Sequence, residues 1–325
     1  MRIFLTGASG YIGSRLAARL VADGHEVCAL VRPTSDRTTL DRIGARCFAG
    51  DVTDRYSMRE GMSGADWVIH AAADLEFGGP AARQRAVNVD GSENVASLAF
   101  KLGVGRLLAI SSIAVFGGSP SDGAPANEES PVLEPLPSLY GVTKRQGDRA
   151  ISAWAERGLR VNTAYPSLVY GPPGKKRGGN ALLRQIALGR LPALVAADRK
   201  TSWVHLDDLV EGLVRVMDHA PPGEEYLFAG DAITVAELAE VVAGIADASP
   251  PRLRLPLALA RLVGEVSRPW YRLRGRRSPF LPDYLRSLAR HWVFDDAKAR
   301  RELGWERRSL ARGLPETVRY LVDHG

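Results

Sequence analysis

Two residues capable of acid/base chemistry stand four positions apart near the middle of the chain. Tyr140 and Lys144 fall in a segment, 139–157, whose pattern predicts a helix, so both side chains lie on one helix face. Tyrosine has a pKa of about 10 and is a poor base at neutral pH. A lysine ammonium nearby favours the phenolate and is expected to lower that pKa. The pair could therefore exchange a proton with a carbonyl or alcohol oxygen.

Hydroxyl groups that could polarise the same oxygen follow a predicted strand at 106–111. Ser111 and Ser112 stand at its carboxyl end. In a parallel sheet this is the edge along which a bound cofactor lies. The serines, the tyrosine and the lysine are thus expected to converge.

A glycine-rich loop, TGASGYIG, occupies residues 6–13. It joins a predicted strand at 2–5 to a predicted helix at 11–23, and a second strand follows at 26–31. In such a unit the loop backbone approaches a pyrophosphate, and the helix N-terminus offers free N–H groups. No Gly-Lys-Ser/Thr sequence ends the loop, so nucleotide hydrolysis is not expected. The glycine-rich loop and the pair of Tyr140 and Lys144 together indicate an enzyme that transfers a hydride to or from a carbon that bears oxygen.

The end of the second strand bears on the choice of cofactor. An acidic residue there binds a ribose 2′-hydroxyl, whereas an arginine accommodates a 2′-phosphate. The chain has Arg32 at this point, with Ser35 and Arg37 nearby, and its first acid is Asp36. Arg32 therefore predicts NADP, with NAD left open.

The composition sets broader limits. The net charge of +6 over 325 residues fits an anionic cofactor and requires no nucleic acid, so no nucleic-acid partner is expected. Cys28 and Cys47 lack metal-ligand spacing, which predicts reduced thiols and no metal site. No apolar run reaches the roughly 18 residues of a membrane span. With a strand already at the N-terminus, no signal peptide and a cytoplasmic location are expected.

Strands and helices alternate through the first half of the chain. Strands are predicted at 2–5, 26–31, 46–49, 66–72, 106–111 and 159–165, and helices at 11–23, 54–62, 83–103 and 138–157. This alternation predicts an α/β fold with a doubly wound parallel (Rossmann) sheet. Residues 117–137, rich in Pro, Ser, Gly and Glu, are predicted to form a surface loop.

The second half predicts a smaller, mostly helical substrate lobe. Helices are expected near 180–190, 206–219, 234–247, 256–267, 282–290, 295–303 and 313–323, with one strand at 226–228. We expect a cofactor domain at 1–170, with 203–232 returning to it. The substrate lobe is expected at 171–202 and 233–325, over the carboxyl ends of the strands.

These motifs resemble the extended short-chain dehydrogenase/reductase family, which includes nucleotide-sugar epimerases and dehydratases, dihydroflavonol reductases and 3β-hydroxysteroid dehydrogenases. The resemblance covers almost the whole chain. Its segments are TGASGYIG at 6–13, GDVTD at 50–54, HAAA at 70–73, NVDGS at 88–92, SSIAVFG at 111–117, YGVTK at 140–144, PSLVYGP at 166–172, WVHLDD at 203–208 and KARRELGW at 298–305.

The resemblance implies roles for individual residues. Tyr140 would be the acid/base, Lys144 would tune it and hold the nicotinamide ribose, and Ser112 would hydrogen-bond the reacting oxygen. The implied cofactor contacts are Gly7, Gly10, Tyr11, Ile12, Gly13, Arg32, Asp51, Val52, Ala71, Ala72, Ala73, Asn88, Tyr140, Lys144, Pro166, Leu168 and Val169. His205 belongs to a landmark that is more often structural.

Two departures distinguish the chain from nucleotide-sugar enzymes. Those enzymes usually carry an Arg-Asp or Arg-Ser pair directly before the segment at 203–205, where this chain has Thr201 and Ser202. They often carry Arg-Pro-Gly-Asp before the last landmark, where 289–292 here reads Ala-Arg-His-Trp. The lost arginines would have gripped a diphosphate. The apolar segment 256–267 instead resembles the steroid and flavonol reductase branch, and residues 77–79 could line the substrate pocket.

The expected function is therefore an NAD(P)-dependent oxidoreductase that interconverts a ketone and a secondary alcohol on a hydrophobic or ring substrate. An NAD-dependent sugar epimerase or dehydratase that recycles its own hydride stays open, as does a non-catalytic NADP-sensing regulator.

Two expectations concern partners. Family analogy suggests a homodimer built on helices near 90–103 and 139–157. Residues 252–277 contain eight arginines and one acid, Glu265, together with Trp270 and Tyr271. This segment is either a solvated face of the small lobe or a patch that contacts a membrane surface or an anionic carrier of an apolar substrate.

Overall fold

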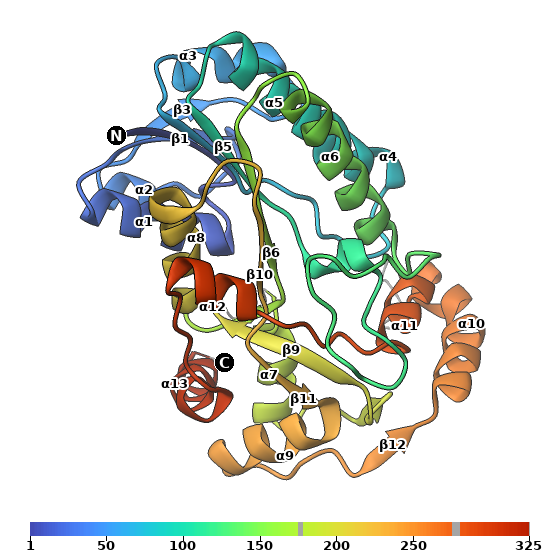
Figure 1. Cartoon of the computed structure of the whole chain (residues 1–325). Helices are drawn as coiled ribbons and strands as arrows, with labels where there is room; N and C mark the ends of the chain where they lie inside the picture. Colours follow the sequence, from blue (N-terminus) through green and yellow to red (C-terminus); the bar gives the residue numbers. More distant parts are fainter. Residues whose placement is uncertain (175–177, 275–279, 325) are drawn as a thin grey trace.

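The structure, a computed structural model, describes residues 1–174, 178–274 and 280–324, and its centre is a parallel sheet. Within these ranges the sheet has seven strands in the order β3-β2-β1-β4-β5-β6-β10 (Figure 1). Their bounds are β1 Arg2–Thr6, β2 Glu26–Val31, β3 Arg46–Ala49, β4 Trp67–His70, β5 Arg106–Ile110, β6 Val161–Pro166 and β10 Glu225–Phe228. The doubly wound sheet is confirmed. The strand order reverses between β1 and β4, the crevice where such sheets bind ligands.

Helices cover both faces of this sheet, so its strands are apolar on both sides. In β1, Ile3 and Leu5 pack on one face and Phe4 on the other, and none of the three is exposed to solvent. The first face is covered by α1 (Tyr11–Ala22) and α8 (Leu206–His219), the second by α3 (Arg59–Met62), α5 (Gly91–Lys101) and α6 (Leu139–Ala155). The continuous apolar run at 2–5 follows from this double burial.

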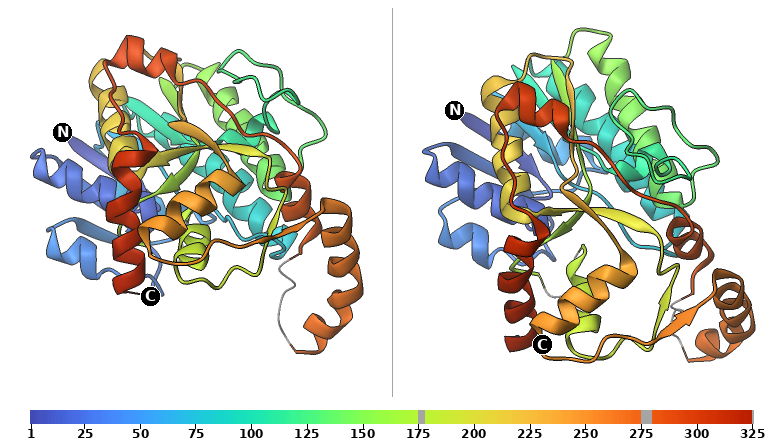
Figure 2. Two further views of the ribbon diagram at one scale, coloured as in Figure 1. Left: turned by 90° about the horizontal axis from the view of Figure 1, so that it is seen from below. Right: turned by 60° about the horizontal axis from the view of Figure 1, so that its bottom comes forward.

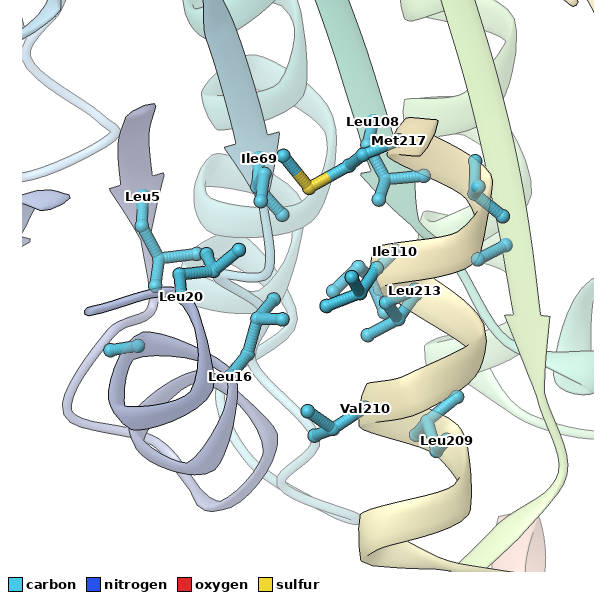
Figure 3. Packing of buried hydrophobic residues seen from close by; sticks show 14 of the residues in the cluster. Leu5, Leu16, Leu20, Ile69, Leu108, Ile110, Leu209, Val210, Leu213 and Met217 are labelled. Atoms are coloured by element: carbon cyan, nitrogen blue, oxygen red, sulfur yellow. The ribbon is translucent and has the colours of Figure 1, made fainter. Parts of the chain in front are cut away.

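The layer between α1, α8 and the sheet is tightly filled. Figure 3 shows Leu16 and Leu20 of α1 facing Val210 and Leu213 of α8, with strand residues such as Ile110 beneath them. Each fully buried side chain of this size contributes roughly 1.5–3 kcal/mol. This packing fixes α1, and with it the glycine loop that precedes α1, against the sheet.

The helix predicted at 83–103 is interrupted. The chain forms α4 (Ala81–Arg85), a π-helical turn η2 (Ala86–Asp90) and then α5. A π turn carries an extra residue and often occurs at functional sites. Here it brings the Asn88 carbonyl so close to α6 that a Cβ on Gly147 would lie 2.1 Å from it.

Most of the remaining elements after β6 lie beyond the carboxyl end of the main sheet, whereas α12 (Ala297–Leu303) packs beside α8 and β10 (Figures 1 and 2). Their other helices are α7 Asn180–Ala187, α9 Val235–Ile245, α10 Leu257–Leu273, α11 Pro282–Leu288 and α13 Leu310–Asp323. Their strands form two small sheets, β11-β9-β7 (Asp231–Thr234, Lys200–His205, Leu168–Tyr170) and β12-β8 (Leu253–Leu255, Ala193–Val195). The sequence predicted these helices but not these strands. The domain division stays a prediction, since β10 joins the main sheet whereas β9 and β11 do not.

The expected surface loop at 117–137 is partly buried, which corrects that expectation. Ser119 and Ala126 are only 3% exposed, and each forms a bridge with the segment at 291–294. The Arg290 guanidinium donates to the carbonyl oxygens of Gly117 and Leu133 at 2.6 and 2.8 Å. Partners more than 150 residues away therefore hold this loop down.

The apolar residues expected to support a homodimer are already used within the chain. Val95 and Ala99 of α5 and Ile151 and Trp154 of α6 are all less than 10% exposed and pack in one core cluster. Phe100 of α5 is a larger apolar side chain that stays 36% exposed, and the homodimer stays a prediction. Among the described residues, no helix is long and apolar enough to cross a bilayer.

Candidate active site

The serine–tyrosine–lysine residues meet at the start of α6. Ser112 caps the short helix η3 (Ile113–Phe116) by accepting from the Ala114 N–H, and its hydroxyl lies near enough to Tyr140 to lower the pKa of that phenol. Lys144 follows one turn later on the same helix and is 3% exposed. Two segments 28 positions apart in sequence thus place a hydroxyl, a phenol and an ammonium together.

The first turn of α6 is fixed from two directions. Ser138 caps it by accepting from the Gly141 N–H at 3.1 Å. The Leu139 N–H donates to Asp283 of α11 at 3.0 Å. Because the first N–H groups of a helix have no partner within it, each such contact orients the turn that carries Tyr140.

Lys144 lies in a buried network that the sequence did not predict. Its Nζ donates to the Ile110 carbonyl oxygen at 3.0 Å, and Asp148, one turn further on α6, raises its pKa against the effect of burial. The Asp148 carboxylate accepts from the Ser111 hydroxyl at 2.6 Å. The only sequence signal for Asp148 is its four-residue spacing from Lys144, which is common in any helix.

The pKa of Tyr140, the expected acid/base group, differs from the sequence-based prediction. Burial raises the pKa of Tyr140 to about 12, although the hydrogen bond from Ser112 lowers it. The sequence predicted the opposite direction, through Lys144. Burial wins because the Lys144 ammonium is directed to the Ile110 carbonyl, where burial also lowers its own pKa. At neutral pH Tyr140 is therefore a phenol, the form that can donate a proton.

The backbone of the glycine loop packs so closely that side chains at Gly7 and Gly13 would clash with neighbouring backbone atoms. A Cβ on Gly7, whose φ is +70°, would lie 2.6 Å from the Ala71 backbone, and one on Gly13 would lie 2.2 Å from the Gly7 carbonyl oxygen. The following helix α1 begins at Gly10 with no side-chain cap and no acid in its first turn. Its N-terminal N–H groups suit an anion, so the loop fits the pyrophosphate of a dinucleotide.

The residues expected near the adenosine lie at the ends of β2 and β3. Arg32 directly follows β2 and is exposed, with the Ser35 N–H closing a turn onto its carbonyl oxygen. Asp51 follows β3 and accepts from both the N–H and the hydroxyl of Thr53 at 2.9 Å, while Val52 is buried. Both strand ends lie on the same sheet edge as the glycine loop.

A buried hydrogen-bond chain joins the glycine-loop strand to α6. It starts where His70 bridges the hydroxyls of Thr6 and Ser92 at 2.8 and 3.1 Å, and Ser92 donates to the Asn88 carbonyl oxygen. Burial, helped by Lys144, lowers the pKa of His70 to about 3, so His70 is neutral. This chain holds β1, β4 and α5 together directly beneath Ala71, Ala72 and Ala73.

The Asn88 side chain continues the chain of hydrogen bonds. Its amide donates to the Asp74 carbonyl oxygen and to the Thr143 hydroxyl, both at 3.0 Å, and accepts from the Asp74 N–H at 2.8 Å. These bonds position the loop after β4 against α6. The expected contact of Asn88 with a cofactor stays a prediction.

The last group of expected cofactor residues follows β6. Pro166 and Val169 are buried and Leu168 is partly exposed. The Tyr11 hydroxyl donates to the Gly171 carbonyl oxygen and accepts from Asn180 at 3.2 Å. The glycine loop is thereby tied to the segment after β7, a link through Asn180 that no motif indicated. Ile12 packs partly buried against the core of the sheet.

Apolar and aromatic side chains stand beside the tyrosine end of α6. Phe77, in the loop after β4, makes an edge-to-face contact with Tyr284 of α11 at 5.9 Å between ring centroids. Leu281 lies against Gly78 of the same loop. Asp283, the neighbour of Tyr284 in α11, also accepts from the Leu139 N–H, so α11 joins this aromatic contact to the first turn of α6.

At the positions where nucleotide-sugar enzymes have arginines that bind a diphosphate, the residues of this chain make structural contacts. Ser202 is fully buried and its hydroxyl accepts from the Phe294 N–H, and Thr201 forms a bridge with Trp292. Arg290 is held by carbonyl oxygens of the 117–135 segment. His205 caps α8 by accepting from the Asp207 N–H, a structural use of that landmark.

Comparison with known proteins supports the family resemblance. Residues 3–229 match the model of the NAD dependent epimerase/dehydratase family. The chain belongs to this family. It is an oxidoreductase of the extended short-chain dehydrogenase/reductase type, and the family and enzyme class expected from the sequence are confirmed.

Relatives cover the whole length of the chain. The sterol demethylase protein B of Methylococcus capsulatus is 28% identical over 100% of this chain and 99% of its own length. The 3 beta-hydroxysteroid dehydrogenase/Delta 5→4-isomerase of Mycobacterium tuberculosis is 30% identical over 99% of this chain and 90% of its own. Among solved structures, gox2253 has a TM-score of 0.86 at 28% identity, covering 99% of this chain and 98% of that one.

Proposed function

We propose that this protein reduces a ketone on a hydrophobic or ring substrate to a secondary alcohol, or runs the reverse reaction, with a nicotinamide cofactor. The observation that carries the proposal is the grouping of Ser112, Tyr140 and the buried Lys144 at the start of α6, where the Ser112 hydroxyl lowers the pKa of Tyr140. It joins a proton donor and a carbonyl-polarising hydroxyl at the end of β5, on the edge of the sheet that carries the glycine loop.

The residues would divide the reaction as follows. The bound reduced nicotinamide supplies a hydride to the carbonyl carbon. Ser112 donates a hydrogen bond to the carbonyl oxygen, and Tyr140 gives that oxygen its phenolic proton. The phenolate that remains takes its proton back from solvent. Lys144 would hold the nicotinamide ribose.

The substrate class is inferred from the side chains of α11 and of the loop after β4, which α11 joins to the first turn of α6. Phe77, Leu281 and Tyr284 offer apolar and aromatic surface, which favours an apolar ring or chain. The sites where arginines would grip a diphosphate are taken up by Thr201 and buried Ser202. The names of the two relatives above refer to sterols and steroids, which agrees with such a substrate.

The proposed cofactor is NADP, because Arg32 stands exposed at the end of β2 without an acid beside it. A guanidinium there would pair with a 2′-phosphate. Titration of the protein with NADPH and NADH, followed by nicotinamide fluorescence, tests this assignment. NADPH should bind at least about tenfold tighter, which is about 1.4 kcal/mol.

The test variant is Arg32→Glu at the end of β2, and its matched control is Arg42→Glu, away from that strand end. Both positions are exposed, and both variants change the charge by the same amount. Arg32→Glu should remove the preference for NADPH, whereas Arg42→Glu should keep it. Equal affinity for both cofactors in the unmodified protein would disprove the role given to Arg32.

A second candidate, an epimerase or dehydratase that recycles its own hydride, is favoured by the description of the matching family model. The reductase and the epimerase or dehydratase differ in whether the cofactor is consumed. A reductase consumes NADPH with each turnover and releases the oxidised form. An enzyme of the second kind would copurify with NAD that does not exchange.

A further inference from the structure

Helix α10 carries an apolar stripe that faces solvent. The stripe consists of Leu259, Leu262, Val263, Val266, Trp270 and Leu273, which are between 37% and 88% exposed. Their spacing of three, four, seven, eleven and fourteen residues from Leu259 places all six on one side of a helix with 3.6 residues per turn. We call these six residues the α10 stripe.

The α10 stripe is separate from the side by which α10 packs on the protein. The packed side includes Ala260 and Gly264, which are buried, and a Cβ on Gly264 would lie 2.8 Å from the Phe280 carbonyl oxygen. These positions are turned roughly 100° or more away from the stripe. The exposed apolar side chains are therefore not the margin of a core.

The surroundings of the α10 stripe are strongly basic. Residues 252–277 contain eight arginines and a single acid. Arg252, Arg254, Arg261 and Arg274 are exposed, and the Arg274 guanidinium lies 4.2 Å from the centroid of the Trp270 ring. Arg276 and Arg277 lie outside the described residues. Apolar side chains with an aromatic–arginine pair at one end are typical of helices that bind lipid headgroups.

The stripe lies at the edge of the molecule and on the side of the candidate active site. In Figures 1 and 2, α10 forms the outer border beyond α11. Through Asp283 and Tyr284, α11 contacts the first turn of α6 and the Phe77 loop. Residues of the α10–α11 region, including Arg261, Leu285 and Arg286, line a cavity of about 330 Å³.

We propose that the α10 stripe and its arginines dock this protein on the surface of an anionic lipid bilayer, with α10 lying parallel to the membrane. The six apolar side chains would enter the boundary between headgroups and acyl chains, and the exposed arginines would pair with lipid phosphates. The docking does not depend on the reaction assigned to Tyr140.

Charge complementarity selects the bilayer over a second copy of the chain. Two copies meeting through this face would bring two arginine-rich segments together, and like charges facing each other oppose association. An anionic bilayer presents the opposite charge and an apolar interior at once. An apolar stripe of this length on a free surface is itself a mark of an interaction site.

Flotation with phospholipid vesicles tests the proposal. The full chain should float with vesicles containing roughly one-third phosphatidylglycerol and at least about tenfold less with pure phosphatidylcholine, and high salt should weaken the binding. The double variant Leu262→Glu/Val266→Glu should bind the anionic vesicles at least about tenfold less. The control Val241→Glu/Val322→Glu, at exposed valines of α9 and α13, should bind as the unmodified protein does.

A second measurement locates the contact. Among the described tryptophans, Trp67, Trp154, Trp203 and Trp305 are less than 10% exposed, Trp292 is partly buried, and Trp270 is 48% exposed. Brominated lipids should quench Trp270 fluorescence in bound protein, and Trp270→Phe should lose most of that quenching. Circular dichroism and cofactor titration show that each variant is folded, so the result is readable even if no ketone is turned over.

Three outcomes would overturn the proposal. The first is absence of binding to anionic vesicles, and the second is binding that the Leu262→Glu/Val266→Glu variant retains. The third is a dimer in sedimentation that this variant converts to a monomer, without vesicle binding by either protein. That result would assign the α10 stripe to a second copy of the chain.

Discussion

At the scale of single residues, the chemistry depends on which effect sets the protonation of Tyr140. Burial raises its pKa, and the hydrogen bond with Ser112 opposes burial without overcoming it. The free protein thus holds a phenol, which is ready to donate a proton in ketone reduction. Alcohol oxidation needs the phenolate of Tyr140, which is the minor protonation state in the free protein.

This difference predicts opposite pH profiles for the two directions. Because the pKa of Tyr140 is about 12, its proton remains in place as pH rises, and kcat/KM for reduction should stay level from about pH 6 to about pH 10. The kcat/KM for oxidation should increase over the same range, by about tenfold per pH unit where no other group intervenes.

Initial rates in both directions across this range, in buffers of constant ionic strength, measure the profiles. Ser112→Ala removes the hydrogen bond that lowers the pKa, so its oxidation rate should be lower at every pH. A reduction profile that falls with an apparent pKa near 7 would contradict the assignment of the proton to the Tyr140 phenol.

At the scale of elements, the position of α6 depends on its close contact with the π turn η2. The Asn88 carbonyl oxygen occupies the space that a side chain at Gly147 would need. In an ordinary helix, replacing glycine with alanine stabilises by roughly 0.5–1 kcal/mol. Here the same change forces two backbone segments apart.

We therefore expect Gly147→Ala to lower the free energy of unfolding by at least about 2 kcal/mol and to reduce turnover, because Tyr140 and Lys144 move with α6. The control is Gly244→Ala on α9, where an added Cβ meets nothing within 4 Å. That variant should gain roughly 0.5–1 kcal/mol. Urea denaturation measures both, and a stabilised Gly147→Ala variant would show that the contact is not tight.

The sequence predicted those elements whose signals are local. The glycine loop, the apolar strands and the four-residue spacing of Tyr140 and Lys144 are legible without knowing the fold. Asp148 and Asn180 gain their contacts from Ser111 and Tyr11, on other elements, and no short motif announces them. The small strands were missed for the same reason: β9 is held by β7, β11 and the segment around Trp292.

At the scale of the whole molecule, two sets of elements meet at Tyr140. The main sheet supplies the glycine loop, the serine motif and α6, and the later segments supply α11 with its aromatic contact to Phe77. The first set suits a dinucleotide, and the second suits an apolar ketone. The central claim of this account is that one hydride passes between them in each turnover, with net consumption of the cofactor.

The most direct test counts NADPH oxidised against alcohol formed from an apolar ring ketone, in the unmodified protein, in Tyr140→Phe and in the exposed control Tyr56→Phe. We predict one NADPH per alcohol for the unmodified protein and for Tyr56→Phe. Tyr140→Phe should lose at least about 100-fold in kcat while binding NADPH with nearly unchanged affinity. Conversion of substrate without net loss of NADPH, or full activity in Tyr140→Phe, would contradict the account.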